Sequence, residues 1–161
     1  MFHIGEQIVY PVHGAGVVEA IEEKEILGEY RKYYSLRLNT GGLQVLVPVD
    51  KAEDSGLRQI CGQDELEKVR KVLSSTEPNW EENWNHRYRL HMDKIKSGDI
   101  CQLAEVVRNL FHREKSKGLS AGEKKMLDNA RDILLSEVQV AAGISTEEAK
   151  QRLLCCLTPH A

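Results

Sequence analysis

The pattern of hydrophobic and polar positions changes character near residue 60. Before that point, short apolar runs partly alternate with polar residues and end at glycine or proline. These runs lie at residues 8–10, 17–22, 33–38 and 43–48. A period of two predicts half-buried β-strands. Gly41 and Gly42 suit a hairpin between the last two runs, and the polar segment 25–29 suits another turn. We therefore expect a small, curled antiparallel sheet.

Beyond residue 60, apolar residues recur at helical spacing instead. One stripe, for example, consists of Leu103, Val106, Val107, Leu110 and Phe111. The first helix opens at Gln63 or Asp64, and a linker follows at residues 74–78. The later helices have candidate N-caps at Asn79, Asp99, Ser120 and Ser145, and glycine stops at Gly98, Gly118 and Gly143. A capping residue, a stripe and a terminal glycine together predict a helix.

These two patterns predict the α+β class, with a small antiparallel β module followed by a compact all-helical domain. We place the division between residues 1–58 and residues 59–161. About fifty residues are marginal for a free-standing hydrophobic core. We therefore expect the sheet to pack against something else.

Composition narrows the class of protein. The chain has 161 residues, 41% of them apolar, which is enough to bury a core. No apolar run approaches the ~20 residues that cross a bilayer. Residues 1–5 show no basic start followed by an apolar core, so we expect no secretory signal. The four cysteines form neither a disulfide framework nor a Cys-x-x-Cys zinc pattern. We expect a cytoplasmic, monomeric protein with reduced thiols.

Charge is divided unevenly along the chain. The whole chain carries 22 basic and 25 acidic side chains, for a formal net charge of −3. Residues 84–125, however, hold ten basic and five acidic side chains. The overall balance excludes tight autonomous binding of nucleic acid by charge alone, but it conceals a basic middle segment.

Catalytic and metal-binding patterns are weak. No Gly-rich phosphate loop followed by Lys-Ser/Thr is present, and His86 and His91 are five residues apart rather than four. Cys101 and His112 lack a third and a fourth metal ligand, and Cys101 lies on an apolar helix face. We therefore expect no cofactor, no metal and no enzymatic activity.

The remaining signal is a cluster of aromatic and basic residues at positions 83–89. Lys and Arg neutralise phosphates, and an indole can stack on bases or wedge between them in a minor groove. Yet Trp80, Trp84, Tyr88, Met92 and Ile95 also recur at helical spacing, which is typical of a buried stripe. Periodicity alone therefore favours a core position for Trp84, and its exposure stays open.

At this segment the sequence resembles the CarD/CdnL family of bacterial transcription regulators, and the resemblance spans essentially the whole chain. It is carried by the order and spacing of Gly5–Pro11 with His13–Gly14, Val47–Pro48, Asn83–Trp84 with Arg87–Tyr88, Ser97–Asp99, Ala104–Leu110 and Gly118–Leu127. The last of these segments, with the sequence GLSAGEKKML, is the clearest match.

The resemblance implies a division of labour. Residues 1–58 would form a Tudor-like module that docks on the lobe of the RNA polymerase β subunit. Residues 59–161 would contact promoter DNA at the upstream fork of the transcription bubble. Trp84 matches the family's wedge tryptophan, which enters the minor groove and stabilises the open promoter complex.

Residue by residue, the resemblance implies DNA-binding roles for Asn83, Trp84, His86, Arg87, Arg89, Arg113 and Lys124. It implies polymerase-binding roles for Lys24, Val45, Leu46 and Val47. His86 and Leu46 stand where some relatives have basic residues, so both contacts are expected to differ here. An alternative is a protein–protein adaptor on RNA polymerase without direct DNA contact.

Overall fold

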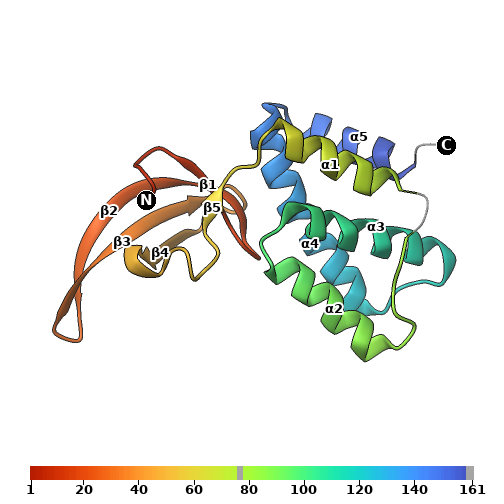
Figure 1. Cartoon of the computed structure of the whole chain (residues 1–161), viewed down its shortest axis with the longest axis horizontal. Coiled ribbons are helices and arrows are strands. Elements are labelled where there is room, and N and C mark those ends of the chain that lie inside the picture. The colour runs from red at the N-terminus through yellow and green to blue at the C-terminus, as the bar shows by residue number, and fades with distance from the viewer. Residues whose placement is uncertain (76–77, 159–161) are drawn as a thin grey trace.

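The N-terminal strands form one antiparallel sheet in the order β4-β3-β2-β1-β5 (Figure 1). The strands are β1 (Gln7–Tyr10), β2 (Gly14–Ile26), β3 (Glu29–Leu38), β4 (Gln44–Pro48) and β5 (Arg58–Gln59), and a short 3-10 helix, η1 (Val49–Lys51), follows β4. This computed structural model describes residues 1–75 and 78–158. The four strands that the sequence predicts are confirmed. The fifth, β5, is too short to show a periodic pattern and was not expected.

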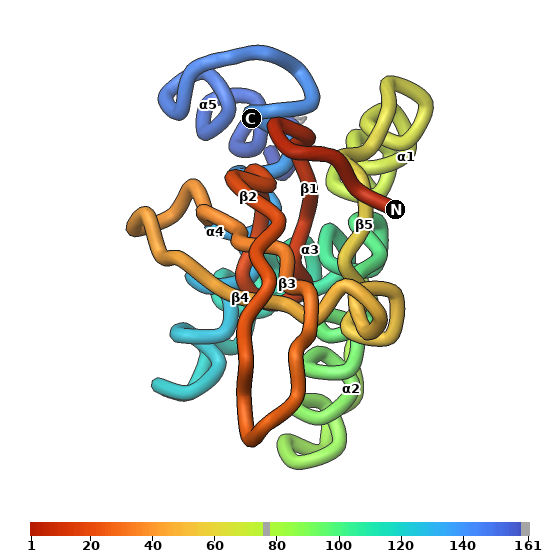
Figure 2. Tube along the Cα trace, turned by 90° about the vertical axis from the view of Figure 1, so that its left-hand side faces the viewer, coloured from red at the N-terminus to blue at the C-terminus, as the bar shows by residue number. Residues whose placement is uncertain are grey.

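The turn that the sequence predicts within residues 25–29 is confirmed, but it is shorter than expected. Strand β2 continues to Ile26 and β3 begins at Glu29, so the turn consists of Leu27 and Gly28 alone. Both have positive φ, 55° and 81°, which makes a tight two-residue hairpin. The polar residues on either side of the turn pair across the ribbon, with Glu23 opposite Lys32 and Glu25 opposite Tyr30. The hairpin reaches well beyond the neighbouring strands (Figure 2).

Five helices follow: α1 (Gln63–Ser74), α2 (Trp84–Lys96), α3 (Ile100–Ser116), α4 (Ala121–Ala142) and α5 (Thr146–Leu157). Three of the predicted caps are confirmed, because the side chains of Asp99, Ser120 and Ser145 each accept a hydrogen bond from a backbone N–H in the first turn. The predicted stop at Gly143 is also confirmed, with a left-handed φ of 67°. Residues 76 and 77 of the expected linker lie outside the described residues.

The predicted cap at Asn79 is wrong. Helix α2 begins four residues later, and Asn83 caps it by accepting a hydrogen bond from the His86 N–H. The backbone N–H of Asn79 is instead bound at 3.1 Å by the side-chain oxygen of Asn109 on α3. The local capping signal at Asn79 is thus displaced to Asn83, and the segment at Asn79 is held by a contact thirty residues away.

The two parts of the chain have separate hydrophobic cores, which confirms the α+β class. The sheet packs around Ile8, Val18, Tyr34, Leu36, Val47, Ala52 and Leu57. The helices pack around a larger cluster to which α1, α3, α4 and α5 all contribute. Across the described residues, no helix is both long and apolar enough to cross a membrane.

Helix α4 joins the two parts through a buried carboxylate. Glu137 is 1% exposed, and both of its oxygens accept hydrogen bonds at 2.7 Å from the Arg58 guanidinium of β5. The backbone N–H of Cys61 also donates to Glu137, and Arg58 Nε donates to the Gly98 carbonyl. Burial opposes the charge of Arg58, but the bonds to Glu137 outweigh burial and raise the pKa of Arg58. The expected packing of the sheet against another element is thus found on α4.

A second contact lies one residue earlier on the same helix. The Ser136 hydroxyl accepts a hydrogen bond from the Ala15 N–H and donates to the Ile133 carbonyl. Gly14 has a φ of 96°, and a Cβ at this position would lie 2.6 Å from Ser136 Oγ. Only glycine therefore fits between β2 and α4.

The division at residue 58 into a β domain and a helical domain stays a prediction. The structure adds that Arg58 and Gln59 pair with β1, so the sheet extends one residue past this boundary.

Gly14→Ala is expected to destabilise the protein by about 1–3 kcal/mol more than Gly28→Ala. Both glycines have positive φ, 96° and 81°, so both substitutions add backbone strain. Only Gly14 is also close to another side chain, because a Cβ at Gly28 meets nothing within 4 Å. Urea unfolding of the two variants measures the difference. Equal losses would show that the contact with Ser136 is unimportant.

Candidate nucleic-acid interface

The first turn of α2 places Trp84 at the protein surface. Asn83 caps the helix, so Trp84 is its first residue, and its side chain is 42% exposed. The indole stacks on Tyr88 one turn later, with ring centroids 5.2 Å apart and an interplanar angle of 23°. Its Nε1–H donates to Ser120 Oγ at 3.0 Å. The core position that periodicity favours for Trp84 is therefore wrong.

Trp80 and Tyr88 occupy the more buried positions of the same stripe. Both are half-buried, and Tyr88 packs against the helical core. Trp80 precedes α2, and the guanidinium carbon of Arg113 lies over its ring, 5.6 Å from the Trp80 ring centroid. The helical spacing thus identified a real apolar stripe, but Trp84 lies at the first position of the helix, where its ring is only partly covered.

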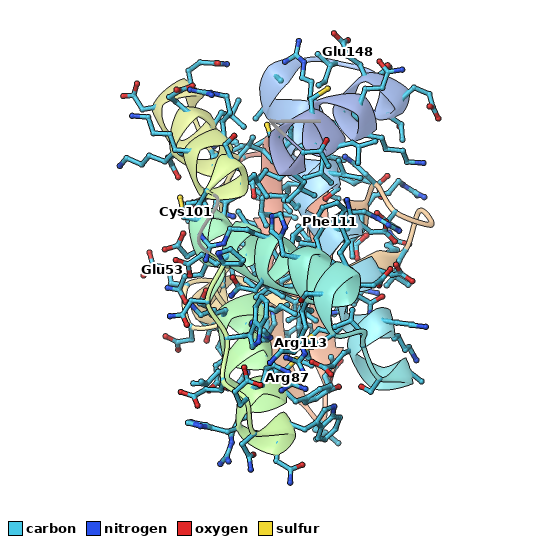
Figure 3. The ribbon with its side chains drawn as sticks, turned by 90° about the vertical axis from the view of Figure 1, so that its right-hand side faces the viewer. Glu53, Arg87, Cys101, Phe111, Arg113 and Glu148 are labelled. Atoms are coloured by element: carbon cyan, nitrogen blue, oxygen red, sulfur yellow. The ribbon has the colours of Figure 1, made fainter. Side chains whose placement is uncertain are left out.

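Arg87 is buried under this surface. Its side chain is 3% exposed and binds both oxygens of Glu123, at 2.7 and 3.0 Å (Figure 3). Its remaining bonds go to the backbone carbonyls of Glu81 and Glu82, at 3.0 and 2.9 Å. The hydrogen bonds to Glu123 raise the pKa of Arg87. Burial alone would raise the pKa of Glu123, but the bonds and charge of Arg87 outweigh it and lower that pKa. In this arrangement Arg87 presents no free donors at the surface around Trp84.

The other residues expected to bind DNA fall into two groups. Asn83, His86, Arg89 and Lys124 are exposed, and Lys124 follows Glu123 directly in the first turn of α4. His86 lies 3.7 Å from a carboxylate oxygen of Glu81. Arg113, in contrast, points inward near the end of α3 (Figure 3), and its Nε and Nη1 are buried without a hydrogen-bond partner. The exposed members of this set therefore lie on α2 with its cap and in the first turn of α4.

Sequence reasoning missed two residues of this surface, Ser120 and Glu123. They form the predicted capping box of α4, with the Glu123 N–H donating to Ser120 Oγ at 3.2 Å. The capping pattern identified the residues but gave no sign of their partners, because Trp84 and Arg87 are each 36 positions away.

A buried histidine lies behind the same surface. His91 is 3% exposed, and its Nε2 lies 3.3 Å from Asn109 Nδ2. Because Asn109 Oδ1 accepts from the Asn79 N–H, its Nδ2 must be the donor to Nε2. Neutral His91 therefore carries its proton on Nδ1, where no acceptor is found among the described residues. Burial lowers the pKa of His91 to about 4.

The residues expected to bind polymerase lie on different faces of the sheet. Lys24 is opposite Arg31, and Leu46 is opposite Ser35. Arg31 and Ser35 are an even number of positions apart on β3, so Lys24 and Leu46 project from the same face. Both are exposed. Val45 and Val47 project from the other face, where Val47 is 3% exposed in the core of the sheet.

Among the described residues, no group of three or more His, Cys, Asp or Glu side chains could hold a metal ion. The four cysteines are free. Cys61 is buried, and burial together with the nearby Glu137 raises its pKa to about 12.

Comparison with known proteins identifies the family. The family model described as the CarD C-terminal domain matches residues 68–154, and the CarD-like/TRCF RID domain matches residues 2–61. The chain belongs to the CarD/CdnL family. The sequence-based resemblance is thus confirmed. The family consists of transcription regulators and is associated with RNA polymerase.

A relative that matches nearly the whole chain supports this assignment, and two solved N-terminal structures are also similar to part of it. A candidate transcription factor of Bacillus subtilis (strain 168), YdeB, is 43% identical over 150 residues, which cover 93% of this chain and 98% of YdeB. The N-terminal part of CdnL from Myxococcus xanthus is 35% identical, with a TM-score of 0.34, over 39% of this chain and 89% of that structure. The 72-residue N-terminal domain of Myxococcus xanthus CarD is 32% identical, with a TM-score of 0.32, over 37% of this chain and 79% of that structure.

The pH dependence of stability should reveal the buried His91. Its pKa is about 4 in the folded state against an ordinary 6.5, so the unfolded state binds more protons as pH falls through this window. Stability is therefore present above about pH 6.5 and lost toward pH 4, by roughly 2 kcal/mol between pH 7 and pH 5. His91→Gln should remove this part of the slope. His86→Gln, on an exposed residue of the same helix, should leave it intact in urea unfolding.

Proposed function

We propose that this protein binds the β subunit of RNA polymerase and stabilises the open promoter complex by wedging Trp84 into the minor groove at the upstream fork of the bubble. The observation that carries the proposal is the half-exposed Trp84 ring at the free end of α2. Polar and basic side chains are exposed on the same end of α2 and in the first turn of α4, namely Asn83, His86, Arg89 and Lys124. An exposed aromatic ring can stack on bases, and basic groups on the same helices can bind phosphates, so this combination suits contact with DNA.

The energetics favour melted DNA over duplex. Inserting an apolar wedge into an intact stack costs a few kcal/mol of unstacking. At the edge of a bubble the stack is already broken, so the wedge binds the open state better than the closed state. A ligand shifts an equilibrium only by its differential affinity for the two states. An additional ~1.4 kcal/mol for the open complex would raise the ratio of open to closed complexes about tenfold.

The charge of the chain fits a protein that polymerase carries to DNA. The formal net charge is −3, and the ion pair with Glu123 removes Arg87 from the supply of free cations near Trp84. Weak phosphate neutralisation means weak binding to bulk DNA. Attachment to polymerase supplies a high effective concentration instead, so the intrinsic affinity for DNA can stay low.

For the polymerase contact we propose the face of the sheet that carries Lys24 and Leu46. The two side chains project from the same side of β2 and β4, and both are exposed. Val47 supports this face from within the core. As an edge strand, β4 also has backbone groups free to pair with a partner, so Val45 and Val47 can contribute through their backbone.

Trp84→Ala should shorten the lifetime of the open promoter complex by up to about tenfold while the protein keeps its affinity for polymerase. Because Trp84 is 42% exposed, the variant should still fold. Leu90→Ala is a matched control, since Leu90 is 39% exposed on the same helix. Lifetimes are measured by competitor challenge. An unchanged lifetime, or a photocross-linker at position 84 that captures protein rather than fork DNA, would favour the adaptor alternative.

Lys24→Glu should weaken binding to the polymerase β subunit about tenfold or more, because it reverses a charge on the proposed face. Lys32→Glu makes the same change on the same hairpin. Lys32 pairs with Glu23, however, so it projects from the opposite face of the ribbon and should have little effect. Titration of labelled protein with polymerase distinguishes the two. Equal losses would mean that the contact is a diffuse charge effect rather than this face.

A further inference from the structure

The side chain of Trp84 is held at two points although it lies at the surface. One face of the indole stacks on Tyr88, and the Nε1 edge is bound by Ser120 Oγ at 3.0 Å. A partly exposed tryptophan has no need of a protein partner for its N–H, because water is available. The two contacts together restrict both side-chain torsions of Trp84 and determine which part of the ring remains exposed.

Ser120 has no hydrogen-bonding capacity left over. A hydroxyl offers one donor and two acceptor positions. Ser120 Oγ accepts from Trp84 Nε1 and from the Glu123 N–H, and it donates to Glu123 Oε1 at 3.3 Å. With all three positions in use, the direction of the bond to the indole is set by the first turn of α4.

The same carboxylate also fixes the backbone that leads into α2. Glu123 binds Arg87 through both oxygens, and Arg87 binds the carbonyls of Glu81 and Glu82. These carbonyls lie immediately before the cap and Trp84. The backbone and the ring of Trp84 are therefore both tied to the first turn of α4, the backbone through Arg87 and the ring through Ser120.

We propose that Ser120 is a positioning residue that holds the Trp84 ring in one orientation, so that it meets the fork of the bubble as a pre-oriented wedge. The proposal rests on the proposed function of Trp84. A ring that already has its bound orientation loses less side-chain freedom when it inserts, and the saved entropy appears as a longer complex lifetime. The bond also occupies the only polar atom of the indole, so the ring offers its apolar surface to DNA.

Ser120 is also the N-cap of α4, so its removal has a second effect that needs a control. Ser145 caps α5 in the same way, with its Oγ accepting from the Glu148 N–H at 3.1 Å. Ser145 is bonded to no aromatic ring among the contacts that the structure describes. Ser145→Ala thus removes a cap of the same kind without changing the surroundings of Trp84. Ser120→Thr keeps a hydroxyl that can serve both roles.

The first arm of the experiment measures the ring itself. Trp80 and Trp84 are the only tryptophans of the chain, so time-resolved fluorescence anisotropy in a Trp80→Phe background reports on Trp84 alone. Ser120→Ala should increase the amplitude of fast local rotation, whereas Ser120→Thr and Ser145→Ala should match the parent protein. Circular dichroism and thermal melting establish that each variant is folded. Unchanged rotation in folded Ser120→Ala would overturn the proposal.

The second arm uses the full chain with polymerase and promoter DNA. Ser120→Ala should shorten the open-complex lifetime by roughly two- to tenfold, with unchanged affinity for polymerase, and Ser120→Thr should restore it. An equal effect of Ser145→Ala would reduce Ser120 to a structural cap and overturn the proposal. Failure of the proposed function has a different signature, because Trp84→Ala itself would then leave the lifetime unchanged. In that case the anisotropy arm still decides whether Ser120 orients the ring.

Discussion

A carboxylate can be buried only if an opposite charge and hydrogen bonds replace the water it loses, and α4 carries two buried carboxylates. Glu123 and Glu137 are each 1% exposed. Glu123 accepts two hydrogen bonds from the guanidinium of Arg87 on α2. Glu137 accepts two from the guanidinium of Arg58 on β5. Removing one partner of such a pair typically costs about 3–5 kcal/mol, since the other charge remains buried. The placement of both the sheet and the Trp84 surface therefore depends on α4.

The two pairs differ in what they organise. The Arg58–Glu137 pair connects the sheet to the helices, together with the hydrogen bond between Ala15 and Ser136. The Arg87–Glu123 pair organises the first turns of α2 and α4, where the exposed tryptophan lies. Both arginines are engaged by these glutamates, so neither offers its full positive charge to a partner molecule. Under the proposed function, in which one protein contacts polymerase and DNA at once, this arrangement is favourable, because flexible attachment would lower the effective concentration of one contact relative to the other.

Sequence reasoning succeeded where the decisive interaction is local. The caps at Asp99, Ser120 and Ser145 follow from residues two or three positions apart, and the strand runs follow from simple alternation. It failed where a distant partner decides. The Asn79 cap was wrong because the helix begins after Asn83, and the segment at Asn79 contacts Asn109 on α3 instead. The partner of Arg87 is 36 positions away and that of Ala15 is 121 positions away, and a single sequence carries no signal of either. The family resemblance identified the surface around Trp84 but not that Arg87 lies beneath it.

Because both carboxylates lie on one continuous helix, the distance between them is set by counting residues. Glu123 and Glu137 are fourteen positions apart, which corresponds to ~21 Å along the axis and to a rotation about 40° short of four full turns. The spacing along α4 between the contact with the sheet and the contact near Trp84 can therefore take only certain values. A single inserted residue would turn one glutamate about 100° away from its arginine, whereas seven would lengthen the reach by ~10 Å and rotate it by only about 20°. The length of α4 between the two glutamates can therefore change only by insertions that come close to a whole number of turns.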